Sequence, residues 1–473
     1  MNKAIAKPNF TEGAIFLKLL LFIFPIVATN LLQAFYNAAD MIVVSFSSEE
    51  NAVAAIGTTT AFINLIVNIF IGFSVGANVV VARQIGAKNR ENTQKAVHTS
   101  IVMAVIFGFL GMIIGLLAAK PVMTMMGNTG SLLTLAVRYT YIYFLGIPFL
   151  SLTNYLIAIF RAKGDSKTPL IVLMTAGLLN VGLNFFFVLI VGLSVEGVAI
   201  ATSVSNLFSS AILLVKLQKD QDDTQFSWKK LRIDKRSFSD ITVNGVPAGI
   251  QGALFSLSNM IIQSSVVRVN NTLCPNTSYA PVVDGNAAAT NLESFVYTAM
   301  NAVYQGAITF TSQNIGAKKP RRVYKILYNC LGIVIAIGVC FSALVYLLRI
   351  PLLGLYGVEL GVEGSLQRIA FETAHTRFKY ICLLYFLCGT MDVCSGTLRG
   401  LGKSFVSMII SLVGACLFRL VWIWTVFSNN PTLDMIYISY PISWTLTCIT
   451  GFTIIQICLR KMVKQLEPIN PKT

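Results

Sequence analysis

Hydrophobic residues along this chain form long runs that carry no charge. Residues 96–119, 168–195, 197–215 and 326–348 contain no Asp, Glu, Lys or Arg. A helix needs roughly 17–25 mostly apolar residues to cross a bilayer. The strict alternation of apolar and polar positions that marks membrane β-strands is missing. We therefore predict an all-α polytopic membrane protein.

The apolar runs and the turn signals between them predict twelve transmembrane helices. Pro25, Pro148 and Pro247 fall inside spans, where membrane helices tolerate proline if neighbouring groups satisfy the freed backbone. The approximate bounds of the spans are 15–46, 52–83, 95–119, 131–160, 168–190, 194–216, 239–268, 284–312, 323–348, 371–398, 404–427 and 434–460.

Composition agrees with this interpretation and charge gives it a direction. Of the 473 residues, 55% are hydrophobic and only 12% are charged, about half the charged fraction of soluble domains. The net charge of +16 does not require a nucleic-acid partner, because most Lys and Arg residues fall on one side of the predicted spans. The positive-inside rule then places both termini in the cytoplasm, and we expect a multi-pass protein of the inner (cytoplasmic) membrane.

The two halves of the chain repeat each other. "RQIGAKNRENTQKA" (83–96) matches "SQNIGAKKPRRVYKI" (312–326), and "FRAKGDSKTP" (160–169) matches "LRGLGKSFVS" (398–407). Each half contains six predicted spans, an even number, so the chain returns to the same side and the repeats are parallel. The glycines in the first pair of segments are expected to permit tight turns between spans.

The repeat divides the chain into three parts. We predict a six-helix lobe at 1–216, a cytoplasmic linker at 217–238 and a second six-helix lobe at 239–473. Within the linker, "FSWKKLRI" is compatible with a short interfacial helix and equally with a plain solvated connector.

These paired segments, and the first span "PIVATNLLQAFYNAADMIVVSF" (25–46), resemble the multidrug and toxic compound extrusion (MATE) transporters, nearest the DinF-like prokaryotic branch. The resemblance implies two six-helix lobes around a central cleft. It also implies a secondary active antiporter, not an enzyme, that exports amphiphilic or cationic compounds by alternating access. Inward movement of H⁺ or Na⁺ would drive export, with no other cofactor. We expect small-molecule substrates, the lipid bilayer as surroundings, and a monomer.

Asp40 is an isolated acid inside the first span, between Lys18 and Glu49 as the nearest charges. An ionisable residue within a span is a functional candidate, and removal from water favours the neutral form of a carboxyl group, which suits proton carriage. In the DinF-like branch the corresponding Asp couples ions. Asp40 acting only as a hydrogen-bond acceptor is the structural alternative.

The residues that match the family partners of this Asp are Asn180 and Thr202, while Asn184 stands where the family has a second acid. Sodium sites favour negative oxygen ligands, so this departure favours H⁺ at Asp40 over Na⁺ held by Asp40, Asn180 and Thr202.

The second half has its own ionisable residues. Asp392 lies seven residues before Arg399, where the NorM-like branch places a coupling Asp. The acid that this branch has on the seventh span is missing, and Glu293 on the eighth span is a substitute. Arg419 is expected to pair with one of these acids, because an unpaired buried charge is costly. Such a pair either couples ions by rearranging or only stabilises the fold.

Promiscuous binding suits a cleft with aromatic and apolar walls and few polar groups. Each candidate for the cleft has packing inside a lobe as its alternative role. The candidates are Gln33, Tyr36, Asn37, Tyr139, Asn154, Gln251, Tyr297, Met300 and Asn301.

Three other functions fit the sequence less well. A flippase for lipid-linked sugars of the same superfamily needs several interior cations for the pyrophosphate, and the spans offer Arg419 alone. An intramembrane enzyme is disfavoured, since H-E-x-x-H and G-x-S-x-G motifs are missing. A passive channel is disfavoured by the lack of charged rings or repeated filter loops.

Overall fold

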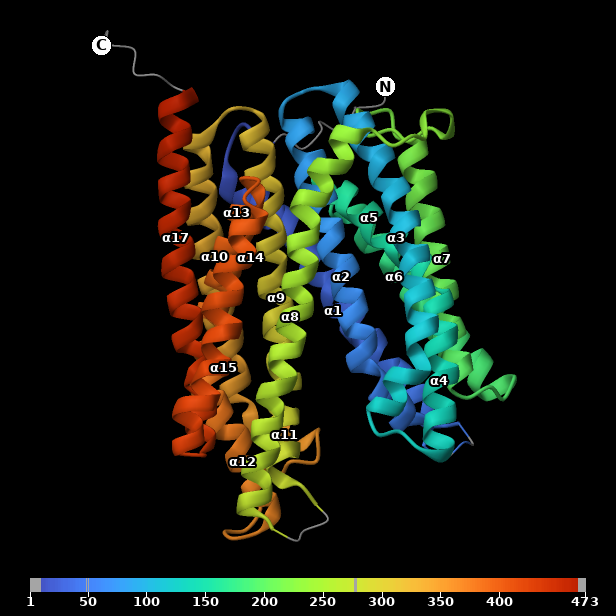
Figure 1. The fold of residues 1–473 in the computed structure, drawn as a ribbon, viewed down its shortest axis with the longest axis vertical. Coiled ribbons are helices and arrows are strands. Elements are labelled where there is room, and N and C mark those ends of the chain that lie inside the picture. Colours follow the sequence, from blue (N-terminus) through green and yellow to red (C-terminus); the bar gives the residue numbers. More distant parts are fainter. Residues whose placement is uncertain (1–9, 48, 50, 276–278, 467–473) are drawn as a thin grey trace. The chain divides into compact units, whose positions relative to one another are not determined.

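The computed structural model describes residues 10–47, 49, 51–275 and 279–466, apart from the side chains of Asn37 and Leu466. Within these ranges all regular structure is helical (Figure 1). The elements are α1 (Ile15–Val44), α2 (Ala52–Gly86), α3 (Arg90–Met125), α4 (Gly130–Leu145), α5 (Ile147–Ala162), α6 (Lys167–Phe185), the π-helix η1 (Phe186–Ile190), α7 (Val195–Lys219), the 3₁₀ turn η2 (Trp228–Lys230), α8 (Lys235–Leu273), α9 (Pro281–Gly316), α10 (Pro320–Leu347), α11 (Arg349–Gly354), α12 (Leu366–Arg377), the π-helix η3 (Phe378–Cys382), α13 (Phe386–Gly400), α14 (Ser404–Ser411), the π-helix η4 (Leu412–Leu417), α15 (Phe418–Trp422), the π-helix η5 (Ile423–Phe427), α16 (Leu433–Tyr437) and α17 (Ser439–Leu466).

The number of spans is close to the prediction. In the described part of the chain, nine helices are long and apolar enough to cross a membrane, and eleven are counted if each bent pair is one span. The bent pairs are α4 with α5 (49°) and α12–η3 with α13 (43°). Helix α9, which is 36 residues long, is not among these eleven, so the count is one short of the twelve predicted spans. The all-α membrane fold is confirmed.

The described residues form two compact units. Unit 1 comprises the chain up to Ala253 together with Thr309–Lys319, and unit 2 comprises Leu254–Ile308 and the chain from Pro320 onward. The long helices α8 and α9 therefore each contribute residues to both units.

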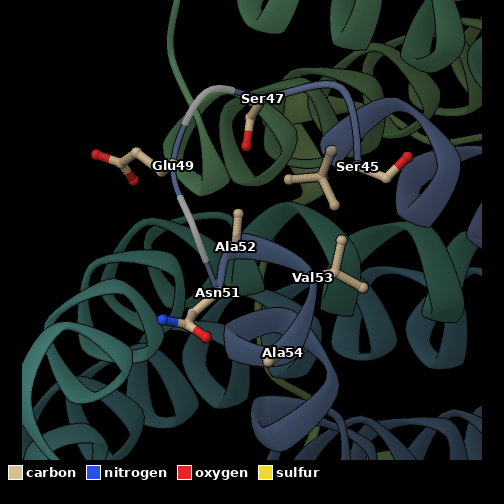
Figure 2. Close-up of a pocket in the computed structure, with 8 residues that line it drawn as sticks. Ser45, Ser47, Glu49, Asn51, Ala52, Val53 and Ala54 are labelled. Carbon is tan, nitrogen blue, oxygen red and sulfur yellow. The ribbon is translucent and has the colours of Figure 1, made fainter.

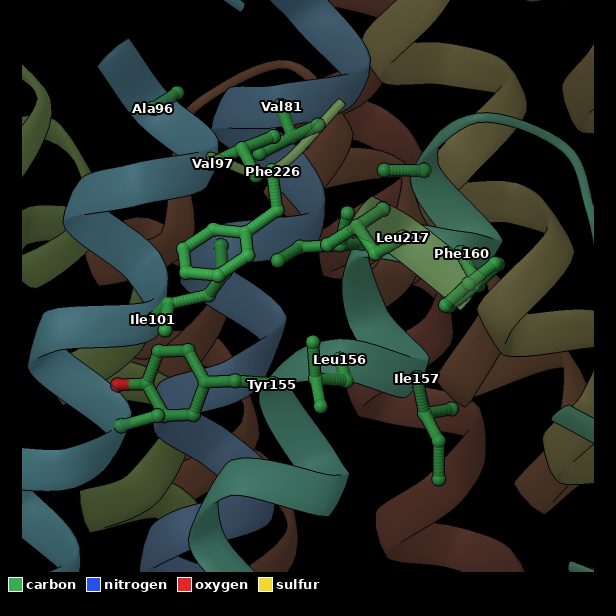
Figure 3. Close-up of a cluster of buried hydrophobic side chains, with 14 of the residues drawn as sticks. Val81, Ala96, Val97, Ile101, Tyr155, Leu156, Ile157, Phe160, Leu217 and Phe226 are labelled. Carbon is green, nitrogen blue, oxygen red and sulfur yellow. The ribbon is translucent and has the colours of Figure 1, made fainter. Parts of the chain in front are cut away.

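The core of unit 1 joins helices that are distant in the sequence. Val81 of α2, Ile101 of α3, and Tyr155 and Phe160 of α5 are buried against one another and against Phe226, which follows α7 (Figure 3). Between membrane helices such contacts are stabilised by the close van der Waals packing of the side chains, since burial from water supplies little driving force in lipid. The core therefore also fixes the segment that leaves α7.

That segment, predicted as an interfacial helix or a solvated connector, forms no helix longer than a single turn; residues 228–233 are exposed, whereas Phe226 is buried. Its only helical element is the single turn η2, and Phe226 stacks on His98 with ring centroids 5.4 Å apart. Nδ1–H of His98 donates to the carbonyl of Gln94 (2.7 Å), which leaves Nε2 to accept from the backbone N–H of Ser227 (3.1 Å). The linker is thus attached to α3 by a buried histidine.

The repeated Gly-Ala-Lys segments build two equivalent turns. Lys88 and Lys318 take left-handed backbone conformations, with φ of 54° and 56°. Gly86 and Gly316 are the last residues of α2 and α9 and are helical. The expectation that these glycines permit the turn is therefore wrong, because lysine occupies the left-handed position.

The two glycines instead allow α2 and α9 to cross in close contact. A Cβ atom on Gly86 would lie 1.9 Å from the carbonyl oxygen of Gln313, and one on Gly316 would lie 2.0 Å from that of Arg83. These contacts are reciprocal, so each repeat supplies the glycine that the other repeat's backbone requires. Close backbone approach at small residues is typical of membrane helix packing.

In unit 2, π-helical segments interrupt the helices beside two buried arginines. Arg377 directly precedes η3, and Arg419 lies in α15 between η4 and η5. A π-helical turn inserts an extra residue and changes the direction of the side chains that follow, which is why such turns are frequent at functional sites. Both arginines point into the interior of unit 2, with 8% and 3% exposure.

Candidate functional site

Asp40 lies within a chain of hydrogen bonds in unit 1. Nδ2 of Asn184 donates to Asp40 Oδ1 (2.5 Å) and to Asn180 Oδ1 (3.3 Å). Nδ2 of Asn180 lies 3.5 Å from Thr202 Oγ1. Asn180 and Asn184 are one turn apart on α6 and so share a face. The structure therefore brings together all four residues predicted for coupling in the first half.

This arrangement offers both a proton acceptor and a group of oxygen atoms. Asn184 is fully buried, and its Oδ1 makes no hydrogen bond. That oxygen, the Asp40 carboxylate and the side-chain oxygens of Asn180 and Thr202 are the ligand types that hard cations prefer. Chemically, the site is suited to gaining a proton at Asp40 or to gathering oxygens around a small cation.

Three tyrosines surround this site or pack close to it. Tyr139, predicted for the cleft, and Tyr143 both interact electrostatically with Asp40, and their rings are 6.0 Å apart. Tyr143 was not predicted, although its position four residues after Tyr139 puts it on the same face of α4. Tyr36 packs between α1 and α6: its hydroxyl donates to the carbonyl of Met174 (3.1 Å), and its ring covers Gly177.

Glu293 forms a buried ion pair in unit 2, but not with the predicted partner. Nε and Nη2 of Arg377 donate to Glu293 Oε2 at 3.0 and 2.8 Å. Nη1 of Arg377 donates to Asn286 Oδ1 (2.9 Å), which also accepts from the Tyr437 hydroxyl (2.9 Å). The expected pairing of an acid with Arg419 is therefore wrong. Arg377 lies near the start of the predicted span 371–398, and α12 carries it into the interior of unit 2.

Asp392 lies in a second polar group of unit 2. Tyr297 lies next to Asp392, and Asn301 lies next to Tyr297, close enough for each pair to interact electrostatically. Arg399, two turns further along α13, interacts electrostatically with Asp392 and donates to the Tyr304 hydroxyl. Tyr297 and Asn301, predicted for the cleft, thus lie with the predicted acid. Tyr304 was not predicted, and no local pattern marks it.

Arg419 is buried, and its guanidinium packs against two aromatic rings. Its guanidinium lies 4.1 Å from the ring centroid of Tyr440 and 5.5 Å from that of Trp444. Nε donates to Ser443 Oγ (2.8 Å), and Nη2 is buried without a hydrogen-bond partner. Among the described residues no carboxylate lies within ion-pair distance of Arg419.

The remaining cleft candidates lie in different environments. Gln33 is exposed, Gln251 is buried in unit 1, and Asn154 donates to the carbonyl of Leu150 (3.0 Å) within its own helix. Met300 is 1% exposed and packs inside unit 2. The side chain of Asn37 lies outside the described residues.

Unit 1 also has a surface hollow at the turn between α1 and α2, with a volume of 580 Å³ (Figure 2). Its lining is mostly small, with Ser45, Ser47 and Ala52 beside Glu49 and Asn51. The described residues that line this hollow include none of the predicted site residues and no aromatic side chain. It therefore does not match the predicted substrate cleft.

Comparison with known proteins gives consistent matches along the chain. The MatE family model matches residues 25–186 and 247–425. The chain is 27% identical over 403 residues to the probable multidrug resistance protein YoeA of Bacillus subtilis, covering 83% of this chain and 82% of YoeA. It is 21% identical over 355 residues to the multidrug export protein MepA of Staphylococcus aureus, covering 75% and 76% of the two chains.

The fold is also that of solved structures. A multidrug resistance MATE family transporter of the MOP superfamily, in its outward-facing conformation, superposes with a TM-score of 0.86 at 18% identity. The superposition covers 98% of this chain and 100% of that one. The family model spans both repeats and reaches from the first predicted span to the eleventh. On this match, the chain belongs to the MATE family of membrane transporters.

Proposed function

We propose that this protein is a secondary active antiporter that exports amphiphilic or cationic compounds, coupled to inward movement of H⁺ at Asp40. Membership of the family and the similarity to YoeA and MepA, a probable multidrug resistance protein and a multidrug export protein, support a role in multidrug export. The observation that carries the coupling is the contact between Asp40 and the buried amide of Asn184.

The proposed step begins when a proton from outside binds the Asp40 carboxylate. An N–H bond to a charged carboxylate is stronger than one to a neutral acid. Protonation therefore weakens the contact that Asn184 makes between α6 and α1. The exporter then shifts between its outward- and inward-open states, provided that the proton binds one state more tightly than the other.

Na⁺ is the alternative coupling ion. The unpartnered Oδ1 of Asn184 adds a neutral oxygen to those of Asp40, Asn180 and Thr202. Only one of these ligands carries charge, which favours the proton. A sodium-driven transporter would need the neutral oxygens as much as the carboxylate, so the two mechanisms differ in how they respond to changes at Asn184.

The test is transport in proteoliposomes with independently imposed H⁺ and Na⁺ gradients. We expect a proton gradient to drive export by the wild type and not by Asp40→Asn, with Asp392→Asn measured in parallel. Asp284→Asn is the matched control, because it removes an exposed acid. Full proton-driven export by Asp40→Asn would overturn the proposal. Loss of sodium-driven export in Asn184→Ala, with no response of the wild type to protons, would favour Na⁺.

A further inference from the structure

We propose that unit 2 contains a binding subsite for the anionic group of an amphiphilic molecule, centred on Arg419. The inference rests on the proposed function and deepens it by naming residues of unit 2 that would bind the anionic group of a substrate. It starts from a comparison of two buried arginines in the membrane-spanning region of unit 2. Arg377 and Arg419 differ in the hydrogen-bond acceptors and the opposite charges that surround them.

Arg377 shows how this unit stabilises a structural arginine. Two of its nitrogen atoms donate to Glu293 and the third donates to Asn286. Charge and donors are both satisfied from within the protein, as a buried cation requires. Arg377 therefore needs nothing further from outside the unit.

Arg419 is more deeply buried and lacks such partners. It is 3% exposed, its Nε donates to the neutral hydroxyl of Ser443, and its buried Nη2 has no partner. In the part of unit 2 that the structure describes, no carboxylate pairs with it. A guanidinium left unpaired in a membrane-spanning segment is costly, so we infer that its acceptor is supplied by a ligand.

The aromatic contacts define the direction from which a ligand would bind. Tyr440 and Trp444 interact with the guanidinium through their ring faces, which lowers the cost of the charge but supplies no acceptor for Nη2–H. The N–H groups of a guanidinium lie in its plane, where a carboxylate or sulfonate accepts them. An anionic group would therefore bind Nη2 in this plane, and because Nη2 is buried, the side chains around it must move to admit the group.

The surroundings also indicate what the anionic group is attached to. Tyr385 packs on Trp444 with ring centroids 5.4 Å apart, and both Tyr385 and Tyr440 are partly exposed. Such walls suit a flat apolar body and give little to a small hydrated ion. The subsite is therefore assigned to an organic anion with an aromatic or apolar skeleton.

Binding of a matched pair of fluorescent dyes tests the proposal. The free acid of a rhodamine carries a carboxylate that its methyl ester lacks. Anisotropy titrations use the full chain in nanodiscs, with empty nanodiscs subtracted. We expect the wild type to bind the acid about tenfold more tightly than the ester, the scale of one charge-assisted hydrogen bond. Arg419→Gln should remove this preference and leave affinity for the ester unchanged, and Arg419→Lys should keep part of it.

Arg268→Gln is the matched control, since it removes an exposed arginine of the same unit that also lies over an aromatic ring. An acid preference that is unchanged in Arg419→Gln, or equally reduced in Arg268→Gln, would overturn the proposal. So would competition by chloride for the acid alone, because the site would then take a small inorganic anion. A preserved acid preference without gradient-driven transport would instead refute the antiporter and leave this subsite standing.

Discussion

Replacing Arg377 by glutamine tests the buried ion pair of unit 2. The substitution removes two hydrogen bonds to Glu293 Oε2, at 3.0 and 2.8 Å, and a third to Asn286 at 2.9 Å. Glu293 is 1% exposed, and its Oε1 already lacks a partner. An uncompensated carboxylate would remain in the interior. We expect a loss of about 3–5 kcal/mol in the free energy of unfolding, the usual cost of breaking a buried pair.

The double variant Glu293→Gln/Arg377→Gln separates charge from packing. Two neutral amides leave no buried charge, so the double variant should be more stable than Arg377→Gln alone. Unfolding by SDS in bicelles measures both. Arg368→Gln is the control, because Arg368 pairs with Glu372 at an exposed site and should cost under about 1 kcal/mol. The reasoning is refuted if Arg377→Gln costs no more than this control, or if the double variant is the least stable.

Further predictions concern unit 1 and the start of α8. Gly316→Ala should lower the melting temperature, because its Cβ atom would lie 2.0 Å from the backbone of Arg83. The control Gly332→Ala should leave the melting temperature nearly unchanged, because nothing lies within 4 Å of the added Cβ atom. Equal effects of the two substitutions would contradict the close crossing of α2 and α9. Phe226→Ala should cost about 3–5 kcal/mol by leaving a cavity, measured by thermal unfolding, and a negligible loss would mean that the linker is not anchored. Hydrogen bonds from the backbone N–H and hydroxyl of Ser237 lower the pKa of Asp234, so this cap stabilises α8 above the usual aspartate pKa and is lost as pH falls through the lowered value. Asp234→Ala should therefore lower the free energy of unfolding by about 1 kcal/mol near neutral pH and by less in acid. A stability difference between wild type and variant that grows in acid would contradict this expectation.

The spans were predictable because the bilayer imposes a simple requirement. A segment that crosses the hydrocarbon core must form its backbone hydrogen bonds within the protein and must be apolar along its full length. Both requirements leave a clear pattern in the sequence. The grouping of Asp40 with Asn180 and Asn184 was also accessible. The two asparagines share a face of α6 by spacing, and the resemblance to a family placed that face opposite Asp40.

The partner of Glu293 was not predictable from the pattern of residues. Arg377 is 84 positions away in the chain, and the pairing depends on where α12 begins and how α12 packs. Counting charges near span ends assigns such an arginine to a loop. The role of Gly86 was not predicted for a similar reason. In the sequence a glycine just before a turn is typical of the turn itself, whereas the contact of Gly86 with the distant residue Gln313 depends on how α2 and α9 pack.

The repeat preserves backbone geometry and not chemistry. Both copies keep the glycine at the crossing and the left-handed lysine after it. The position that matches Asp40 is Ile262, which is 3% exposed in an apolar cluster of unit 2. The proton site proposed at Asp40 therefore has no counterpart at the matching position of unit 2. Arg419 packs on aromatic rings and pairs with no acid among the described residues of unit 2. The anion subsite proposed there and the proton site proposed at Asp40 therefore use groups of opposite charge in different repeats, an asymmetry that identical repeats could not provide.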